Sequence, residues 1–397
     1  MKVGIIKEGK TPPDKRVPFS PQQCEILVKE FGINLVVQPS PIRCFKDEEY
    51  QNAGITLQED LSDCDVLFGV KEVRKEDLIP EKKYFFFSHT IKEQPYNKSL
   101  LQTLLAKKIQ MIDYECLQHS DGQRILGFGR HAGIVGSYNA LLAWGQRTKT
   151  FELKPANLCE DMMEIKLELQ KIKLANIKIV LTGNGRVAQG AMELLELAGV
   201  TKVQPEEYIK GSFDTAVYTQ MRCHNYYTLN NEEEFSYAHF YKNSKDYKVG
   251  FLPYLNPSDI FISCHYWDNE SPVLFNVSDC NAPNFNTKVI ADITCDIQGS
   301  VPTTLRSTTI SDPLFGFDPK TNSEVGSFDK GAITVMAVDN LPCELPKDAS
   351  MDFGEALIKN IIPELLNTDQ NNIINRASIC VDGELNSYYS YLKSYAS

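Results

Sequence analysis

The sequence predicts an α/β protein with two Rossmann-like domains, each built on a parallel sheet, and a cleft between them. Short apolar runs alternate with helix-like runs along the 397 residues, which is typical of βαβ units. The alternation begins again after residues 131–146, a segment rich in Ala, Gly and Leu that should form a connecting helix. A glycine-rich turn then follows the first strand of the second series. The length also favours two domains.

The first series of elements can be predicted in order along the chain. Apolar runs indicate strands at residues 2–6, 33–37, 66–70, 84–87 and 110–113. Helical periodicity indicates a helix over 21–31 that stops at Gly32, and another over 97–107 with its Leu side chains on one face.

The second series predicts strands at 177–182, 201–204, 259–263 and 289–293. Residues 208–257 are aromatic, polar and irregular, and they are expected to form an insertion. The segment beyond Pro346 should be helical and should pack back on the first domain. The expected domains are therefore 1–130 with 345–397, and 131–344.

Composition and charge exclude several classes of function. The net charge of −11 argues against nucleic acid or an anionic membrane as a partner. No apolar run is long enough to span a bilayer, and the N-terminal residues lack a signal sequence, so a cytoplasmic location is expected. The eleven Cys and six His residues form no ligand cluster, so no metal site is expected.

The turn after the predicted strand at 177–182 matches G-x-G-x-x-A through Gly183, Gly185 and Ala188. It lies between a strand and a helix, which is the context that supports dinucleotide binding. Gly183 allows the tight turn, Gly185 lets the backbone approach a pyrophosphate, and the helix start holds the phosphate charge. Glu206, after the predicted strand at 201–204, could bind the ribose hydroxyls of NAD, although Glu207 is equally available and NADP stays possible.

Candidate catalytic groups follow two strands of the first domain. Lys71 comes after the strand at 66–70, and His89 after the strand at 84–87. Histidine is suited to proton transfer near neutral pH, and a partly buried lysine near other cations can serve as a base. Arg16 and Arg124 could bind carboxylates with two hydrogen bonds each. Taken singly, each residue is also compatible with a structural or surface role.

Several motifs give the chain a family resemblance that covers nearly its whole length. They are Arg16-Val17-Pro18, Gly69-Val70-Lys71, the segment from Phe87 to Lys92, the segment from Ile112 to Glu115, Phe128-Gly129 with Ala132-Gly133, Ala291-Asp292-Ile293, and the segment from Val338 to Pro342. The chain resembles the lysine-forming saccharopine dehydrogenases and lysine–2-oxoglutarate reductases, relatives of alanine dehydrogenase. It is most similar to the branch that includes the reductase half of the bifunctional aminoadipic semialdehyde synthases.

The resemblance implies an NAD(P)-dependent oxidoreductase whose partners are lysine, 2-oxoglutarate and saccharopine. It implies Lys71 and His89 as the acid–base pair, and an ion pair between Asp339 and Lys10. The implied substrate contacts are Arg16, Gln94, Arg124 and Phe128. The implied cofactor contacts are Gly185, Arg186, Glu206, Tyr266, Ile293, Val338, Asp339, Asn340 and Leu341.

Two other functions stay open at this point. One is an alanine dehydrogenase-type oxidoreductase with a smaller substrate. The other is a non-catalytic nucleotide-binding sensor, against which the intact pair of Lys71 and His89 argues. The sequence indicates neither the direction of the reaction nor the oligomeric state.

Overall fold

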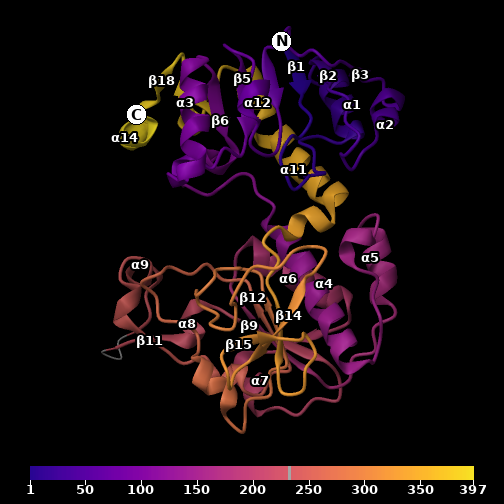
Figure 1. The fold of residues 1–397 in the computed structure, drawn as a ribbon, viewed down its shortest axis with the longest axis vertical. Helices are drawn as coiled ribbons and strands as arrows, with labels where there is room; N and C mark the ends of the chain where they lie inside the picture. The colour runs from indigo at the N-terminus through magenta and orange to yellow at the C-terminus, as the bar shows by residue number, and fades with distance from the viewer. Residues whose placement is uncertain (231–233) are drawn as a thin grey trace. The chain divides into compact units, whose positions relative to one another are not determined.

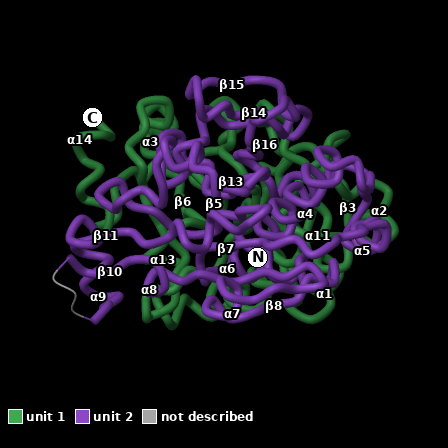
Figure 2. Tube along the Cα trace, turned by 90° about the horizontal axis from the view of Figure 1, so that it is seen from below, with its two compact units in different colours: residues 1–128, 346–397 green, residues 129–345 purple. Residues whose placement is uncertain are grey.

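The computed structural model describes residues 1–230 and 234–397. It divides into two compact units, shown in separate colours in Figure 2. Unit 1 comprises residues 1–128 and 346–397, and unit 2 comprises residues 129–345. Each unit has an eight-stranded sheet of its own.

The sheet of unit 1 has the strand order β18-β17-β6-β5-β4-β1-β2-β3. Its strands are β1 Lys2–Ile5, β2 Asn34–Val37, β3 Thr56–Leu57, β4 Val66–Phe68, β5 Lys83–Phe86, β6 Gln110–Asp113, β17 Ser378–Val381 and β18 Glu384–Leu385. The strands from β6 to β3 pair in parallel, whereas β17 and β18 are antiparallel. Phe68 and Phe85 stack in the middle of the sheet, with ring centroids 4.5 Å apart.

Seven α-helices belong to unit 1, whose residues are all described. They are α1 Pro21–Lys29, α2 Asp47–Asn52, α3 Lys98–Ala106, α11 Pro346–Asn360, α12 Ile362–Leu366, α13 Ile373–Ala377 and α14 Lys393–Ala396 (Figure 1). The start of α1 is set by its sequence, because Ser20 and Gln23 form a reciprocal capping box and Pro21 takes the first helical position. Gly32 follows the helix with φ +64°, as expected of the predicted stop.

The segment after Pro346 begins with helices and joins the first unit, but it also carries strands. Cys380 pairs with Met111, so β17 extends the sheet beyond β6. The expectation of a purely helical tail was therefore wrong. The four residues of β17 are almost wholly buried, and a short buried strand cannot be told from a buried helical segment by periodicity alone.

The sheet of unit 2 has the order β15-β14-β16-β13-β12-β7-β9-β8. Its strands are β7 Lys178–Thr182, β8 Thr201–Lys202, β9 Val217–Met221, β12 Ile260–Ser263, β13 Val289–Asp292, β14 Leu314–Asp318, β15 Ser323–Val325 and β16 Ile333–Met336. The strands from β16 to β8 pair in parallel, and β14 and β15 are antiparallel at one edge. The predicted α/β class is confirmed, and both sheets are mixed and mostly parallel.

The described part of unit 2 contains these α-helices: α4 Gly129–Thr148, α5 Met162–Leu169, α6 Arg186–Leu197, α7 Pro205–Lys210, α8 Cys223–Tyr226, α9 Tyr237–Phe240 and α10 Leu252–Leu255. Helices α4 and α6 pack closely because each has a glycine that faces the backbone of the other helix. A Cβ atom at Gly133 would lie 1.9 Å from the carbonyl oxygen of Val187, and one at Gly190 would lie 1.9 Å from that of Arg130.

The expected insertion over 208–257 does not begin where the sequence suggested. Val217–Met221 forms β9, which pairs with β7 in the main sheet. Its residues are almost all buried, so this part belongs to the core rather than to an insertion. Beyond it, β10 Tyr227–Leu229 and β11 Tyr247–Val249 form a separate hairpin. Part of the expected insertion, residues 231–233, lies outside the described residues.

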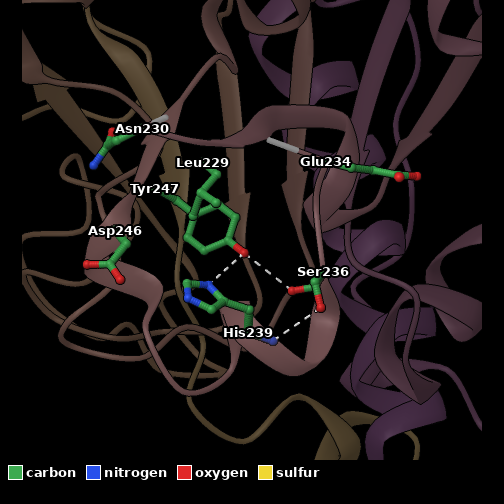
Figure 3. A pocket seen from close by; sticks show the side chains of 7 residues that line it. All are labelled: Leu229, Asn230, Glu234, Ser236, His239, Asp246 and Tyr247. Carbon is green, nitrogen blue, oxygen red and sulfur yellow. Dashed lines mark hydrogen bonds between the residues drawn. The ribbon is translucent and has the colours of Figure 1, made fainter. Parts of the chain in front are cut away.

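The hairpin carries an open pocket of about 450 Å³. Figure 3 shows His239 and Tyr247 meeting inside it, where His239 Nδ1 and the Tyr247 hydroxyl are hydrogen-bonded at 3.1 Å. Across the described residues, no helix is both long and apolar enough to cross a membrane.

Candidate functional site

Lys71 and His89 follow neighbouring parallel strands of unit 1. Strands β4 and β5 pair through Phe68 and Phe85, so both strands end at the same edge of the sheet. His89 adopts a left-handed backbone conformation with φ +54°, which is uncommon outside glycine and is often associated with functional sites. The structure therefore brings the two predicted catalytic side chains to one edge.

Glu72 connects His89 and Lys10 at this edge. Its carboxylate contacts His89 Nδ1 at 2.5 Å and Lys10 Nζ at 2.8 Å. Burial alone would raise the pKa of Glu72, but the hydrogen bonds from His89 and Lys10 lower that pKa to about 2. Glu72 thus stays ionised, and it fixes the ring orientation of His89.

Glu8 holds the backbone that carries Lys71. Its two carboxylate oxygens accept hydrogen bonds from the backbone N–H of Val70, at 2.7 Å, and of Lys71, at 2.9 Å. Burial raises the pKa of Glu8 to about 7 despite these two bonds. The sequence patterns did not indicate Glu8. Its position three residues after the end of β1 is the signal that could have indicated it.

The environment of Lys71 lowers the pKa of its ammonium group below the usual value. Burial lowers the pKa of Lys71 first, and the positive charge of Arg16 lowers it further. The charges of Asp14 and Glu72 act in the opposite direction without cancelling the shift. A lysine with a lowered pKa can accept a proton during a reaction.

Arg16 is a buried cation next to this group. Its Nε and Nη2 atoms bind the two carboxylate oxygens of Asp14 at 3.0 and 2.6 Å. Its guanidinium lies 4.1 Å from the ring centroid of Phe128, and Phe128 stacks on Phe353. Two predicted substrate contacts, Arg16 and Phe128, are therefore in direct contact with each other.

The other two predicted substrate contacts, Gln94 and Arg124, have different neighbours. Arg124 and Lys92 both bind Oε1 of Glu115, at 3.2 and 3.3 Å. Gln94 is exposed and accepts a hydrogen bond from the hydroxyl of Tyr96. The part of Gln94 and Arg124 in substrate binding stays a prediction.

The glycine-rich turn of unit 2 has the geometry that its sequence predicts. Gly183 has φ +102°, and a Cβ atom there would lie 2.5 Å from the carbonyl oxygen of Cys264. Gly185 is the N-cap of α6, and a Cβ atom there would meet nothing within 4 Å. Gly185 and Arg186 thus lie at an open helix start, which suits an anionic phosphate.

The remaining predicted cofactor contacts follow the carboxyl ends of adjacent parallel strands. Tyr266 comes after β12 and is 83% exposed, and Ile293 comes directly after β13. The segment after β16 supplies the buried Val338 and Leu341, the exposed Asp339, and Asn340 at the start of a 3-10 helix. Since β7, β12, β13 and β16 are consecutive neighbours, these residues share the edge of the glycine turn.

Glu206 follows β8, which is the outermost strand on that side of the sheet and not the neighbour of β7. Strand β8 ends at Lys202, opposite Tyr218 near the start of β9, and Glu206 follows on the short helix α7. The carbonyls of Tyr208 and Gly211 accept hydrogen bonds from Nζ of Lys178, the first residue of β7, so α7 ends at the opposite edge of the sheet.

The strand order explains this difference. The strand beside β7 on that side is β9, with β8 one place further out. A residue that reads the ribose is expected at the carboxyl end of the neighbour of β7. There β9 ends at Met221 and is followed by the exposed Arg222.

A buried histidine next to the glycine turn was also missed. His265 follows β12 and hydrogen-bonds the hydroxyls of Thr182, at 2.7 Å, and Ser300, at 2.8 Å. Burial lowers the pKa of His265 to about 4, so the ring is neutral near pH 7. Its place at a strand end was a signal, but the adjacent Tyr266 was predicted as the cofactor contact instead.

Comparisons with known proteins agree with this architecture. Residues 4–135 match the family described as alanine dehydrogenase/PNT, N-terminal domain. A solved structure of L-alanine dehydrogenase superposes with a TM-score of 0.63 at 17% identity, covering 100% of this chain and 99% of the other. That likeness shows the fold.

Sequence relatives extend the match across both units. The alpha-aminoadipic semialdehyde synthase of Arabidopsis thaliana is 30% identical over 98% of this chain and 41% of its own length. The mitochondrial enzyme of Rattus norvegicus is 28% identical over 96% of this chain and 46% of its own length. A saccharopine dehydrogenase [NAD(+), L-lysine-forming] of Schizosaccharomyces pombe is 25% identical over 88% of this chain and 90% of its own length.

The resemblance to the saccharopine dehydrogenase family is confirmed. The chain spans less than half the length of the two semialdehyde synthases described above. The name of the rat relative places that protein in mitochondria, so the expected cytoplasmic location of this chain stays a prediction.

Proposed function

We propose that this chain interconverts saccharopine with lysine and 2-oxoglutarate, using a nicotinamide dinucleotide. The observation that carries the proposal is the group at the carboxyl edge of the unit 1 sheet. There Lys71, with a lowered pKa, lies beside Glu72, which holds His89. The relatives are named for related activities, and the glycine turn of unit 2 supports dinucleotide binding.

In the proposed reaction, the ε-amine of lysine adds to the keto carbon of 2-oxoglutarate, and water leaves to give an imine. A nicotinamide dinucleotide held at the glycine turn would supply the hydride for reduction of this imine to saccharopine. Lys71 and His89 move the protons on the substrate amine and on the departing oxygen. Glu72 holds His89 in place, and Arg16 provides a fixed positive charge for a substrate carboxylate.

The direct test measures oxidation of NADH or NADPH by the full chain with lysine and 2-oxoglutarate, omitting each in turn. Turnover is expected only when both substrates are present. Pyruvate with ammonia serves as the comparison pair. Turnover with that pair instead would favour an alanine dehydrogenase, and cofactor binding without turnover on any amino acid would favour a sensor.

The choice of cofactor has its own test. We propose NAD, which is part of the fungal relatives' names. Arg222 after β9 instead favours NADP, because its cation could bind a 2′-phosphate. If Glu206 reads the ribose, Glu206→Ala should weaken NAD use relative to NADP, and Arg222→Ala should change neither. If Arg222 reads a 2′-phosphate, Arg222→Ala should lower NADP use about tenfold or more and spare NAD.

A further inference from the structure

Unit 2 contains a cavity that no part of the proposed reaction uses. It measures about 430 Å³ and lies along the flank of α4, next to the loop before β14. A volume of this size suits a small molecule, since ligand pockets commonly enclose about 300–1,000 Å³. Its principal lining residues are Asn139, Leu142, Asn157, Asp312, Phe328 and Glu344.

Glu344 is the buried acid of this cavity, with a relative exposure of 3%. Its Oε1 accepts a hydrogen bond from the side-chain amide of Asn139 at 2.9 Å, and it also accepts one from the backbone N–H of Asn157. Both donors are neutral, and no lysine, arginine or histidine is among the described residues that line the cavity. A buried carboxylate without a cationic partner is costly.

The walls show what else a ligand must satisfy. Leu142, Leu158 and Phe328 give the cavity apolar surface, and Leu158 and Phe328 are largely exposed at its rim. Asp312, on the loop before β14, is the second acid of the lining. The lining therefore combines apolar walls with two carboxyl groups, which favours a cation on a short hydrocarbon chain and disfavours an anion.

We propose that the Glu344 cavity binds a small primary aliphatic amine, with the ammonium group on the Glu344 carboxylate and the hydrocarbon chain against Leu142 and Phe328. Helix α4 begins at Gly129, next to Arg186 at the glycine turn, and reaches Arg147, which binds the residues at the start of β16. The cavity lies along the later part of this helix, so the site is separate from the glycine turn. The proposal does not depend on the proposed reaction, because it is tested by binding alone.

Binding should be linked to a proton. Burial raises the pKa of Glu344 to about 7, whereas Asn139 and Asn157 lower it by hydrogen bonding. The other titratable group of the described lining is Asp312, on the facing loop. Below pH 7 an ammonium ion must displace the proton of Glu344, so affinity should rise as pH rises through 7 and then level off.

The experiment titrates the full chain by calorimetry with three probes of equal length, n-pentylamine, 1-pentanol and pentanoate. At about pH 8, pentylamine is expected to bind at least about tenfold more tightly than pentanol, and pentanoate is expected not to bind. At about pH 6, in buffers of different ionisation enthalpy, amine binding should release close to one proton.

Glu344→Gln should remove the preference for the amine, whereas Glu152→Gln, an exposed acid of the same unit, should keep it. Amine binding that survives Glu344→Gln would assign it to another site and overturn the proposal. Equal affinities for amine and alcohol, or no amine binding at about 10 mM, would also overturn it. If Glu344→Gln does not fold, Asp312→Asn and the wild type provide the test. An amine affinity that is unchanged in Asp312→Asn, together with no proton release by the wild type, would overturn the proposal.

Discussion

At the proposed reaction centre, the carboxylate of Glu72 binds the side chains of His89 and Lys10. The arrangement keeps Glu72 ionised and leaves Lys71 as the group whose pKa is lowered. Two groups that exchange protons with a substrate need different affinities for the proton and fixed positions. The two groups should therefore act as a unit in turnover.

We expect Lys71→Met and His89→Gln each to lower turnover by about 10²–10⁴-fold. The double variant should be much less than multiplicatively worse, because the groups act together. Steady-state rates with saccharopine across pH measure this, and Lys71→Met should also remove the limb of the pH profile that belongs to Lys71. Near wild-type turnover in both single variants would make the pair structural and reject the mechanism.

Arg16 provides a second residue-level prediction with a matched control. Arg16→Lys keeps the charge but loses the planar fork held by Asp14, so the Michaelis constant for saccharopine or 2-oxoglutarate should rise by about tenfold. Arg43 is the control, because it is also paired with an aspartate, Asp47, and lies over an aromatic ring, that of Tyr50.

Arg43→Lys should lower the melting temperature without changing either Michaelis constant. Cofactor affinity should stay near that of the wild type in both variants. Equal effects of the two substitutions on the Michaelis constants would mean that Arg16 supports the fold and does not bind substrate.

At the level of elements, the glycines of the turn and of the helix pair have different tasks. A Cβ atom at Gly185 meets no protein atom within 4 Å, whereas one at Gly190 would collide with the carbonyl of Arg130. Gly185→Ala should therefore fold normally but bind the dinucleotide more weakly, because the methyl group keeps the pyrophosphate away. Gly190→Ala should destabilise unit 2 by about 1–3 kcal/mol.

Thermal melting and cofactor titration of the two variants separate these effects. Cofactor affinity in Gly190→Ala, measured well below its melting temperature, should be close to that of the wild type. Normal cofactor affinity in Gly185→Ala would show that the backbone of this turn does not approach the pyrophosphate.

Sequence patterns predicted the strands and helices that have strong periodicity. They failed for elements whose position depends on pairing with distant parts of the chain. The strands β7, β12 and β13 lie within two residues of their predicted bounds, because apolar runs between turns are a local signal. Strand β9 was missed since its Tyr218, Thr219 and Gln220 look polar, yet the first two are fully buried. Its pairing with β7 also changed the placement of Glu206, because strand order is not a local property.

The candidate site was predictable to the same extent. Lys71 and His89 could be placed at one edge because neighbouring parallel strands end together. The contacts of Glu8 could not be assigned, since they depend on the geometry of the loop after β1. Sequence spacing likewise gave no sign that Arg124 has Glu115 as its partner.

At the scale of the molecule, the two units differ in how the chain builds them. Unit 2 is continuous from 129 to 345, with its own sheet and buried clusters. Unit 1 needs two separate segments, since β17 covers the edge of β6 and Phe353 stacks on Phe128. Unit 2 should therefore be able to fold alone, and the first segment of unit 1 should not.

A fragment of residues 129–345 is expected to give a cooperative melting transition and to bind the dinucleotide within about tenfold of the full chain. Residues 1–128 alone should aggregate, because the edge of β6 is left unpaired. Co-expression with residues 346–397 is the control and should restore solubility. A soluble, cooperatively folded 1–128 fragment would contradict this division of tasks.

The pairing of β17 with β6 also has a consequence for the order of folding during synthesis. Gln110 and Ser378, which meet across these strands, are 268 residues apart in the chain. On the ribosome, all of unit 2 emerges before Ser378 does. Unit 2 can therefore fold while residues 1–128 still lack the strand that completes their sheet. The edge of β6 stays unpaired until β17 has been made, which exposes it to pairing with other chains. A chain that stops before Ser378 should accordingly lack a stable unit 1.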